Sequence, residues 1–177
     1  MTRAIFALSV ILLASCNGDK QSTNLIHCTS NILQCRSYLN HFISEEKNLP
    51  NTSDTVGAFQ TMGMPFGSNP DFPTIRFMGC PDAFEKYKTI GFIYVGSGIG
   101  SQRVTFGRPL ILFCPAESHN GVANVLEGTE WSRLNNKEMI ELLLSSIAKG
   151  EGKAMPYSTA ALDIMRKEVE IRKRLKL

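Results

Sequence analysis

The residues of this chain with the most reactive side chains are its cysteines and the histidine that follows the last of them. Cys114 and His119 lie close together in the stretch FCPAESHNG, and both Cys80 and Cys114 precede a proline. A cysteine beside a histidine can act as a nucleophile or ligate zinc, and two cysteines can form a disulfide. Each of these chemistries demands a different sequence pattern.

The patterns of common catalytic and zinc-binding motifs are absent from the sequence. It contains no CxxC or HxxxH spacing, no G-x-S-x-G elbow and no H-E-x-x-H motif. His27 and His41 fall in a helical pattern, where we expect them to face solvent. We therefore predict no enzyme, no metal site and no cofactor. The alternative is a periplasmic metal-binding protein or enzyme that uses Cys80, Cys114 and His119.

A disulfide is the chemistry that we predict for Cys80 and Cys114. The N-terminal sequence, treated next, indicates export, and disulfides form in oxidising compartments. Cys28 and Cys35 are two helical turns apart, or about 10 Å, whereas a disulfide tolerates Cα atoms up to about 7 Å apart. Cys80 and Cys114 are therefore the better candidate pair.

The first residues indicate export and a lipid anchor. Arg3 precedes an apolar run over residues 4–13, which has the length of a signal peptide and is too short to span a membrane. The run ends in LASC, which resembles a bacterial lipobox, so residues 1–15 would be removed and Cys16 would carry the acyl chains, palmitate among them. The alternative is an ordinary signal peptide cut nearby, with Cys16 unmodified.

A lipid on Cys16 makes the protein anchored to a membrane rather than spanning it. Asn17 follows the cysteine, and by the rule usual for bacterial lipoproteins this residue indicates the outer membrane, with the protein facing the periplasm. Residues 16–23 are polar, and we expect them to form a tether behind the lipid.

A long amphipathic helix is predicted after the tether, from residue 24 to about residue 48. Its apolar residues recur at steps of three and four, which is the spacing of one helical face. These residues are Leu25, Cys28, Ile32, Cys35, Leu39 and Phe42. Pro50 ends the helix, and residues 50–82 are rich in Pro, Gly and small polar residues, which predicts an irregular connection.

Antiparallel strands are predicted from about residue 89 onward. The runs TIGFIYVG, RVTFG and PLILFC are β-branched and aromatic and are separated by glycines. The segment ANVLEGTEW is typical of a tight hairpin, with Glu127 and Gly128 as its turn residues. His119, Asn120 and Gly121 would form the loop before this hairpin, and so mark the fold rather than a reaction.

Two helices are predicted to close the chain. Asn135 and Glu138 have the spacing of a capping box, and Gly150 ends the first helix. The second covers residues 158–177, and its buried side would carry Leu162, Met165, Val169 and Arg172. Its basic residues form either a solvated face near the helix C-terminus or a contact site for anionic lipid or an acidic partner. These residues are Arg166, Lys167, Arg172, Lys173, Arg174 and Lys176.

The ordered set of these segments resembles the pseudopilins of type II secretion systems, in the branch with a histidine and an Asp-Gly pair near its end. The sequence CTSNILQCRSYLNHFISEEKNLP resembles the soluble half of a pilin-type first helix. CP, YVGSG, CP, HNG, NVL, G and EW then follow in the family's order. The resemblance implies a pilin-like module over residues 24–134, with residues 135–177 as a helical extension.

Two departures from the pseudopilin pattern affect function. The chain has no prepilin-peptidase site and no uninterrupted apolar first helix, so we expect polymerisation through such helices to be lost. The Asp-Gly turn is shortened to Glu127-Gly128, so an acidic calcium-type loop has no clear counterpart.

We therefore predict an α+β fold in which a long N-terminal amphipathic helix packs on a small antiparallel sheet, with C-terminal helices added. The predicted function is a non-enzymatic binding or accessory protein of the envelope, linked by the resemblance to type II secretion. Its expected partners are the membrane, through the lipid anchor, and secretion-system or other envelope proteins. The formal net charge is only +3, so we expect no nucleic-acid partner.

Overall fold

The fold is mixed α+β, as predicted. The structure is a computed structural model, and the residues that it describes are 20–45, 48–52, 54–63, 80–82 and 91–175. The lipobox with Cys16, residues 16–19 of the tether, and Lys176 lie outside these residues. Within the described part, no helix is long and apolar enough to cross a membrane.

The first described helix, α2 (Lys20–Ser44), carries the predicted apolar stripe. It begins at Lys20, so the end of the predicted tether is helical. The stripe is buried as predicted, because Cys28, Ile32, Cys35, Leu39 and Phe42 all lie in the core. His27 and His41 are exposed, also as predicted.

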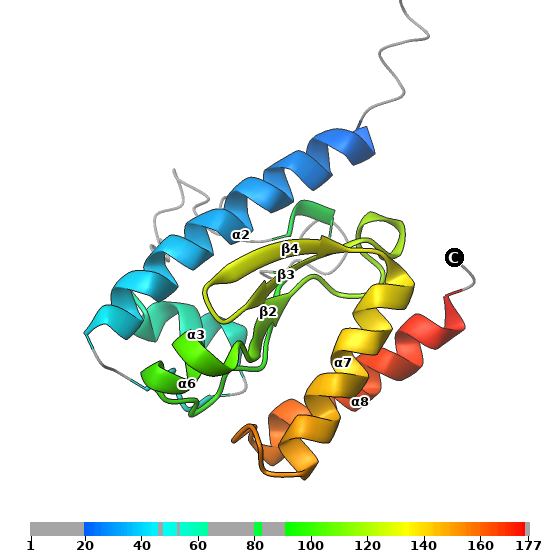
Figure 1. The fold of residues 1–177 in the computed structure, drawn as a ribbon. Coiled ribbons are helices and arrows are strands. Elements are labelled where there is room, and N and C mark those ends of the chain that lie inside the picture. The colour runs from blue at the N-terminus through cyan, green and yellow to red at the C-terminus, as the bar shows by residue number, and fades with distance from the viewer. Residues whose placement is uncertain (1–19, 46–47, 53, 64–79, 83–90, 176–177) are drawn as a thin grey trace, which may run out of the picture.

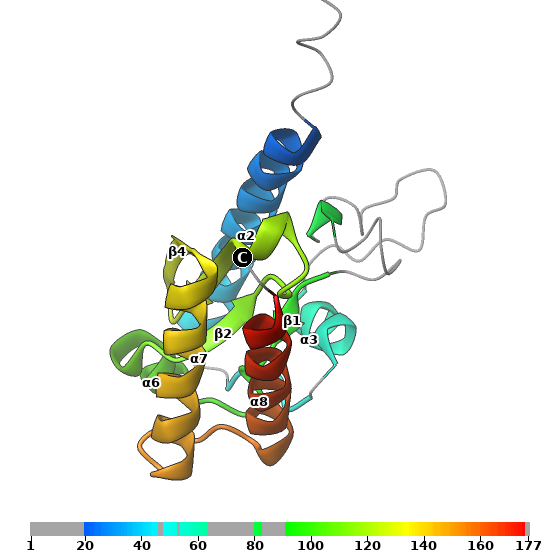
Figure 2. The ribbon, with the colours of Figure 1, turned by 90° about the vertical axis from the view of Figure 1, so that its right-hand side faces the viewer.

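Four antiparallel strands form one sheet in the order β1-β2-β3-β4. They are β1 (Ile93–Tyr94), β2 (Leu110–Phe113), β3 (Ala123–Glu127) and β4 (Glu130–Leu134). Every residue of β2 and all but the last of β3 are buried, so both faces of the central strands are covered. Figures 1 and 2 show α2 along one side of the sheet and the C-terminal helices on the other.

The segment RVTFG, predicted as a strand, is part of helix α6 (Ser101–Gly107). Val104 is its buried residue, whereas its neighbours on both sides are exposed. A strand would place Val104 and Phe106 on the same face, but Phe106 is 86% exposed, so only Val104 packs against the core. Local β propensity therefore does not decide its structure. Arg108, in the left-handed conformation, ends the helix.

The β3–β4 hairpin exists as predicted, but its turn lies one residue later. Glu127 pairs with Glu130, so Gly128 and Thr129 are the loop residues rather than Glu127 and Gly128. Gly128 has a positive φ, at +56°, and a Cβ there would lie 2.5 Å from the Val104 carbonyl oxygen. The turn thus depends on glycine, because α6 packs directly against it.

The short helix α3 (Thr55–Thr61) begins inside the region predicted to be irregular, where Asp54 caps it. Helix α7 (Asn136–Glu151) starts with the predicted capping box. Leu144 of this helix is 47% exposed. Helix α8 (Thr159–Arg174) packs against α7. Buried residues of α7 and α8 join the same core as α2 and the sheet, so the C-terminal helices are integral to this fold.

Candidate metal centre

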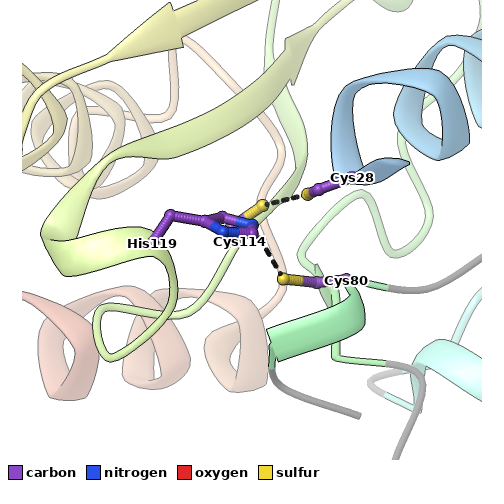
Figure 3. Close-up of side chains that lie close together, drawn as sticks. All are labelled: Cys28, Cys80, Cys114 and His119. Atoms are coloured by element: carbon purple, nitrogen blue, oxygen red, sulfur yellow. Dashed lines mark hydrogen bonds between the residues drawn. The ribbon is translucent and has the colours of Figure 1, made fainter. Parts of the chain in front are cut away.

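Three cysteines and one histidine from distant parts of the chain come together at one end of the sheet. The ligand atoms of Cys28, Cys80, Cys114 and His119 all lie within 4.8 Å of one another, and all four residues are buried. The sulfur atoms of Cys28 and Cys114 are 3.1 Å apart, and the Cys80 sulfur is 3.2 Å from His119 Nε2. Figure 3 shows the four side chains pointing toward one another.

Each of these residues is placed by a different local structure. Cys28 belongs to the buried stripe of α2. Cys80 precedes a short helical turn at residues 81–82. Cys114 directly follows β2, and its N–H donates to Asn124 O at 3.1 Å, which continues the pairing with β3 by one residue. His119 begins the 3₁₀ helix η2 (His119–Gly121), in the connection from β2 to β3.

The backbone around His119 is strained. His119, Asn120 and Gly121 are consecutive and all have positive φ, at 49°, 54° and 83°. Such conformations cost of order 1–3 kcal/mol for each non-glycine residue and persist where the surrounding structure enforces them. They are common at functional sites, and here they lie at the residue that supplies the imidazole.

Asp82 orients the imidazole of His119. Its Oδ2 lies 2.6 Å from His119 Nδ1 and accepts a hydrogen bond from the His119 backbone N–H at 3.1 Å. The contact at Nδ1 is an ion pair when the imidazole is protonated. Asn24 Nδ2 donates to the other oxygen at 2.6 Å. A carboxylate behind a histidine, with the second ring nitrogen toward the thiols, is the usual arrangement at metal sites.

The three thiols strongly influence one another's ionisation. Hydrogen bonds with Cys114 and Cys28 lower the pKa of Cys80 far below its usual range, against the effect of burial. Burial, and then contact with Cys28 and Cys80, raises the pKa of Cys114. Contact with Cys114 lowers the pKa of Cys28, but contact with Cys80 and burial outweigh it, so the net shift is upward. The protein alone therefore favours one thiolate among the three.

The histidine balances that single thiolate. Burial lowers the pKa of His119, but its contacts with Cys80 and Asp82 raise it above the usual value. Three thiolates in this space would repel one another strongly, because burial penalises each charge. A divalent cation removes that penalty, since a coordinated thiol is deprotonated outright. The cluster is thus suited to hold a metal ion in place of its protons.

The ligand set and its size indicate which ion fits. Three sulfurs and one imidazole nitrogen match the Cys₃His set of structural zinc sites. In tetrahedral zinc with Zn–S bonds of about 2.3 Å, sulfur atoms lie about 3.8 Å apart. The shortest sulfur contact here, 3.1 Å, and the outer limit of 4.8 Å bracket that value. Thiolate ligands select zinc over magnesium and calcium, which prefer oxygen.

A buried amide next to the cluster is placed to stabilise a thiolate ligand. Asn124 is fully buried, and its Nδ2 has no hydrogen-bond partner among the described residues. Its contact with Cys28 lowers the pKa of that thiol. An amide N–H stabilises a thiolate better than a thiol, which favours the charged form that a metal requires.

The cluster is buried in the protein. Cys28, Cys80 and Cys114 are 0% exposed, and His119 is 5% exposed. Catalytic zinc sites keep one coordination position open, whereas structural sites fill all four with protein ligands. This arrangement corresponds to the structural type.

The structure brings together the residues of the sequence-based alternative, Cys80, Cys114 and His119, and adds Cys28. The sequence assigned Cys28 to the core, because its place on an apolar stripe hides any second role. None of the cysteines in the described part of the chain forms a disulfide, so the predicted bond between Cys80 and Cys114 is not observed. That disulfide stays a prediction, and the short sulfur contact of Cys114 is with Cys28 instead.

One of the basic residues of α8 does not lie at the surface. Arg172, which we placed both on the buried side of this helix and in a contact site for lipid or protein, is 0% exposed, so the buried placement is confirmed and the contact assignment is wrong. Arg166 pairs with Glu151 and Asp163, and Lys173 pairs with Glu170. Lys167 and Arg174 are exposed.

Comparisons with family models, curated proteins and solved structures found no match to this chain. The resemblance to pseudopilins therefore depends on the sequence motifs alone.

Proposed function

We propose that this protein is a zinc-binding, non-catalytic module that a lipid anchor holds at the bacterial cell envelope. The observation that supports zinc binding is the buried cluster of Cys28, Cys80, Cys114 and His119, with all ligand atoms within 4.8 Å. The carboxylate of Asp82 behind the histidine adds to it.

The proposed role of the zinc ion is to hold three distant segments together. It would join α2, the turn after Cys80, and the connection between β2 and β3. Among the described residues, Asp82 accepts hydrogen bonds from Asn24 and from the His119 backbone, and Cys80 contacts His119 Nε2. A metal ion bound only by the folded chain stabilises it by mass action.

The setting of this module rests on the N-terminal sequence and on the pseudopilin resemblance. The lipobox supports a lipid on Cys16 and a location at the outer membrane, facing the periplasm. A long helix that contacts the strands of an antiparallel sheet is the arrangement that the resemblance implies. With a lipid anchor in place of an apolar helix, the module would bind partners, secretion-system proteins among them, without polymerising.

The zinc content of the purified protein tests the first part of the proposal. Protein prepared without chelators should contain one zinc per chain by elemental mass spectrometry, and Cys28→Ser and Cys114→Ser should lower that content. Cys35→Ser is the matched control, because Cys35 lies on the same helix but outside the cluster. A wild-type protein that contains no metal and takes up none would refute zinc binding.

Two further experiments test the setting. Mass spectrometry of the N-terminal peptide should find acyl chains on Cys16, and a soluble mature protein without lipid would contradict the anchor. Cross-linking in intact cells should recover secretion-system proteins. Recovery of only abundant envelope proteins would argue against a role in secretion.

A further inference from the structure

A charged side chain lies fully buried beside the metal centre. Arg172, near the end of α8, is 0% exposed. Its Nε donates to Glu168 Oε1 at 3.1 Å, and Glu168 is itself 4% exposed. Buried charges are costly unless they are paired and hydrogen-bonded, so the surroundings of this guanidinium indicate what it does.

The other nitrogens of Arg172 hold both ends of the connection between β2 and β3. Nη2 donates to Cys114 O at 2.8 Å, and Nη1 donates to Gly121 O at 3.1 Å. The segment between these two carbonyls includes His119. One side chain from α8 therefore makes hydrogen bonds to both ends of the segment that supplies two of the four candidate metal ligands.

This segment needs support from outside itself. Its backbone at His119, Asn120 and Gly121 is left-handed throughout, and such conformations persist only where neighbouring structure enforces them. The planar guanidinium suits this task, because its donors have a fixed geometry that a lysine ammonium lacks. Without the hydrogen bonds from Arg172, the strained residues would relax and move the imidazole away from the thiols.

The guanidinium is itself held firmly in place. Besides the bond to Glu168, Nη1 lies 3.3 Å from Asn136 Oδ1, and Asn136 Nδ2 donates to Arg172 O at 3.2 Å. Asn136 is the first residue of α7. Both C-terminal helices thus fix the position of Arg172 relative to the metal-binding segment.

We infer that Arg172 is a positioning residue of the metal centre, which fixes Cys114 and His119 through the carbonyls of Cys114 and Gly121 and so couples helix α8 to the bound ion. This inference rests on the proposed zinc site. Because coupling between two sites is reciprocal, zinc should also stabilise the docking of α8. Residues that support metal ligands typically change metal affinity by 10- to 100-fold when they are replaced.

The test compares Arg172→Lys with two controls. Arg174→Lys makes the same change at an exposed position, and Val169→Ala removes buried apolar packing of α8 but no hydrogen bond to the metal-binding segment. Zinc affinity is measured by competition with a chromophoric chelator, and cobalt spectra report the number of thiolates bound. We expect Arg172→Lys to lose at least tenfold in affinity and to alter the cobalt spectrum. Both controls should keep the wild-type spectrum.

The outcomes separate the inference from the proposed function. If the wild-type protein binds neither zinc nor cobalt, the proposed function fails and the inference with it. If the wild type binds zinc but Arg172→Lys matches it, or Val169→Ala changes the cobalt spectrum equally, only the inference fails. Hydrogen exchange of the wild type tests it without any substitution. Zinc should slow exchange in α8, and equal exchange rates with zinc and with chelator would overturn the coupling.

Discussion

Cys28→Ser should remove most of the stability that zinc provides by linking α2 to the other ligand segments. The ion would join Cys28 to Cys80 and so close a loop of about 50 residues, and closing such a loop contributes about 4 kcal/mol in the chain-entropy model. A serine hydroxyl is a poor zinc ligand, because zinc prefers thiolate and imidazole. Zinc bound only by Cys80, Cys114 and His119 would not link α2 to the other two segments. The zinc-dependent part of the unfolding free energy should therefore fall by about 4 kcal/mol.

The measurement is urea unfolding, followed by circular dichroism, with zinc and with a strong chelator. Subtracting the two free energies of unfolding for each variant removes effects that do not involve the metal. Cys35→Ser is the control, because Cys35 and Cys28 are both 0% exposed and lie on the same helix. It should destabilise the protein equally with zinc and with chelator. An unchanged zinc-dependent difference in Cys28→Ser, or an equal loss in Cys35→Ser, would refute the reasoning.

Three other predictions concern the cluster and the core. Hydrogen peroxide should release zinc and join Cys28 to Cys114, whose sulfurs are 3.1 Å apart; the two thiolates lose two electrons, and peroxide is reduced to water. Peptide mapping that finds another cysteine pair would contradict this. Asp82→Asn should weaken zinc binding by 10- to 100-fold in chelator competition, and an unchanged affinity would exclude the orienting role. Tyr157→Phe should cost about 1–3 kcal/mol in urea unfolding, because the hydroxyl bonds both the buried N–H and the C=O of Leu110. Burial raises the pKa of Tyr157 to about 12, so its contribution to stability is present below its usual pKa, near 10, and is lost as pH rises toward 12. Tyr157→Phe should therefore lose less stability than the wild type over that range.

Periodic patterns predicted the elements whose burial is regular. The apolar stripe of α2 could be predicted because five of its residues face one core. The capping box of α7 could be predicted because its two residues are only three positions apart. Helix α6 could not be predicted in this way. Val104 is its single buried residue, and one buried residue defines no hydrophobic repeat. The turn after β3 was displaced by one residue, because pairing with β4 rather than glycine alone fixes its position.

The sequence predicted no metal site and offered Cys80, Cys114 and His119 only as an alternative, for a reason that concerns distance along the chain. Cys114 and His119 are neighbours in sequence, but Cys28 and Cys80 reach them only through the packing of α2 and of the turn at residues 81–82. Spacing rules such as CxxC detect ligands that share one local structure. Here three separate segments contribute, so the fold has to be known before the cluster can be seen.

A disulfide and a zinc ion are competing uses of the same cysteines, and the surrounding residues favour zinc. A bond between Cys80 and Cys114 would leave Cys28 as an odd buried thiol, and Cys35 is too distant along the helix to pair with it. It would also leave His119 strained in its backbone, with no role for its contact with Asp82. A zinc ion uses the third thiol, the imidazole and the carboxylate behind it, and its charge offsets the burial and the neighbouring thiols that raise the pKa of Cys114. In an oxidising compartment, early capture of zinc would also protect these thiols, because coordinated and buried sulfurs are poorly accessible to oxidants.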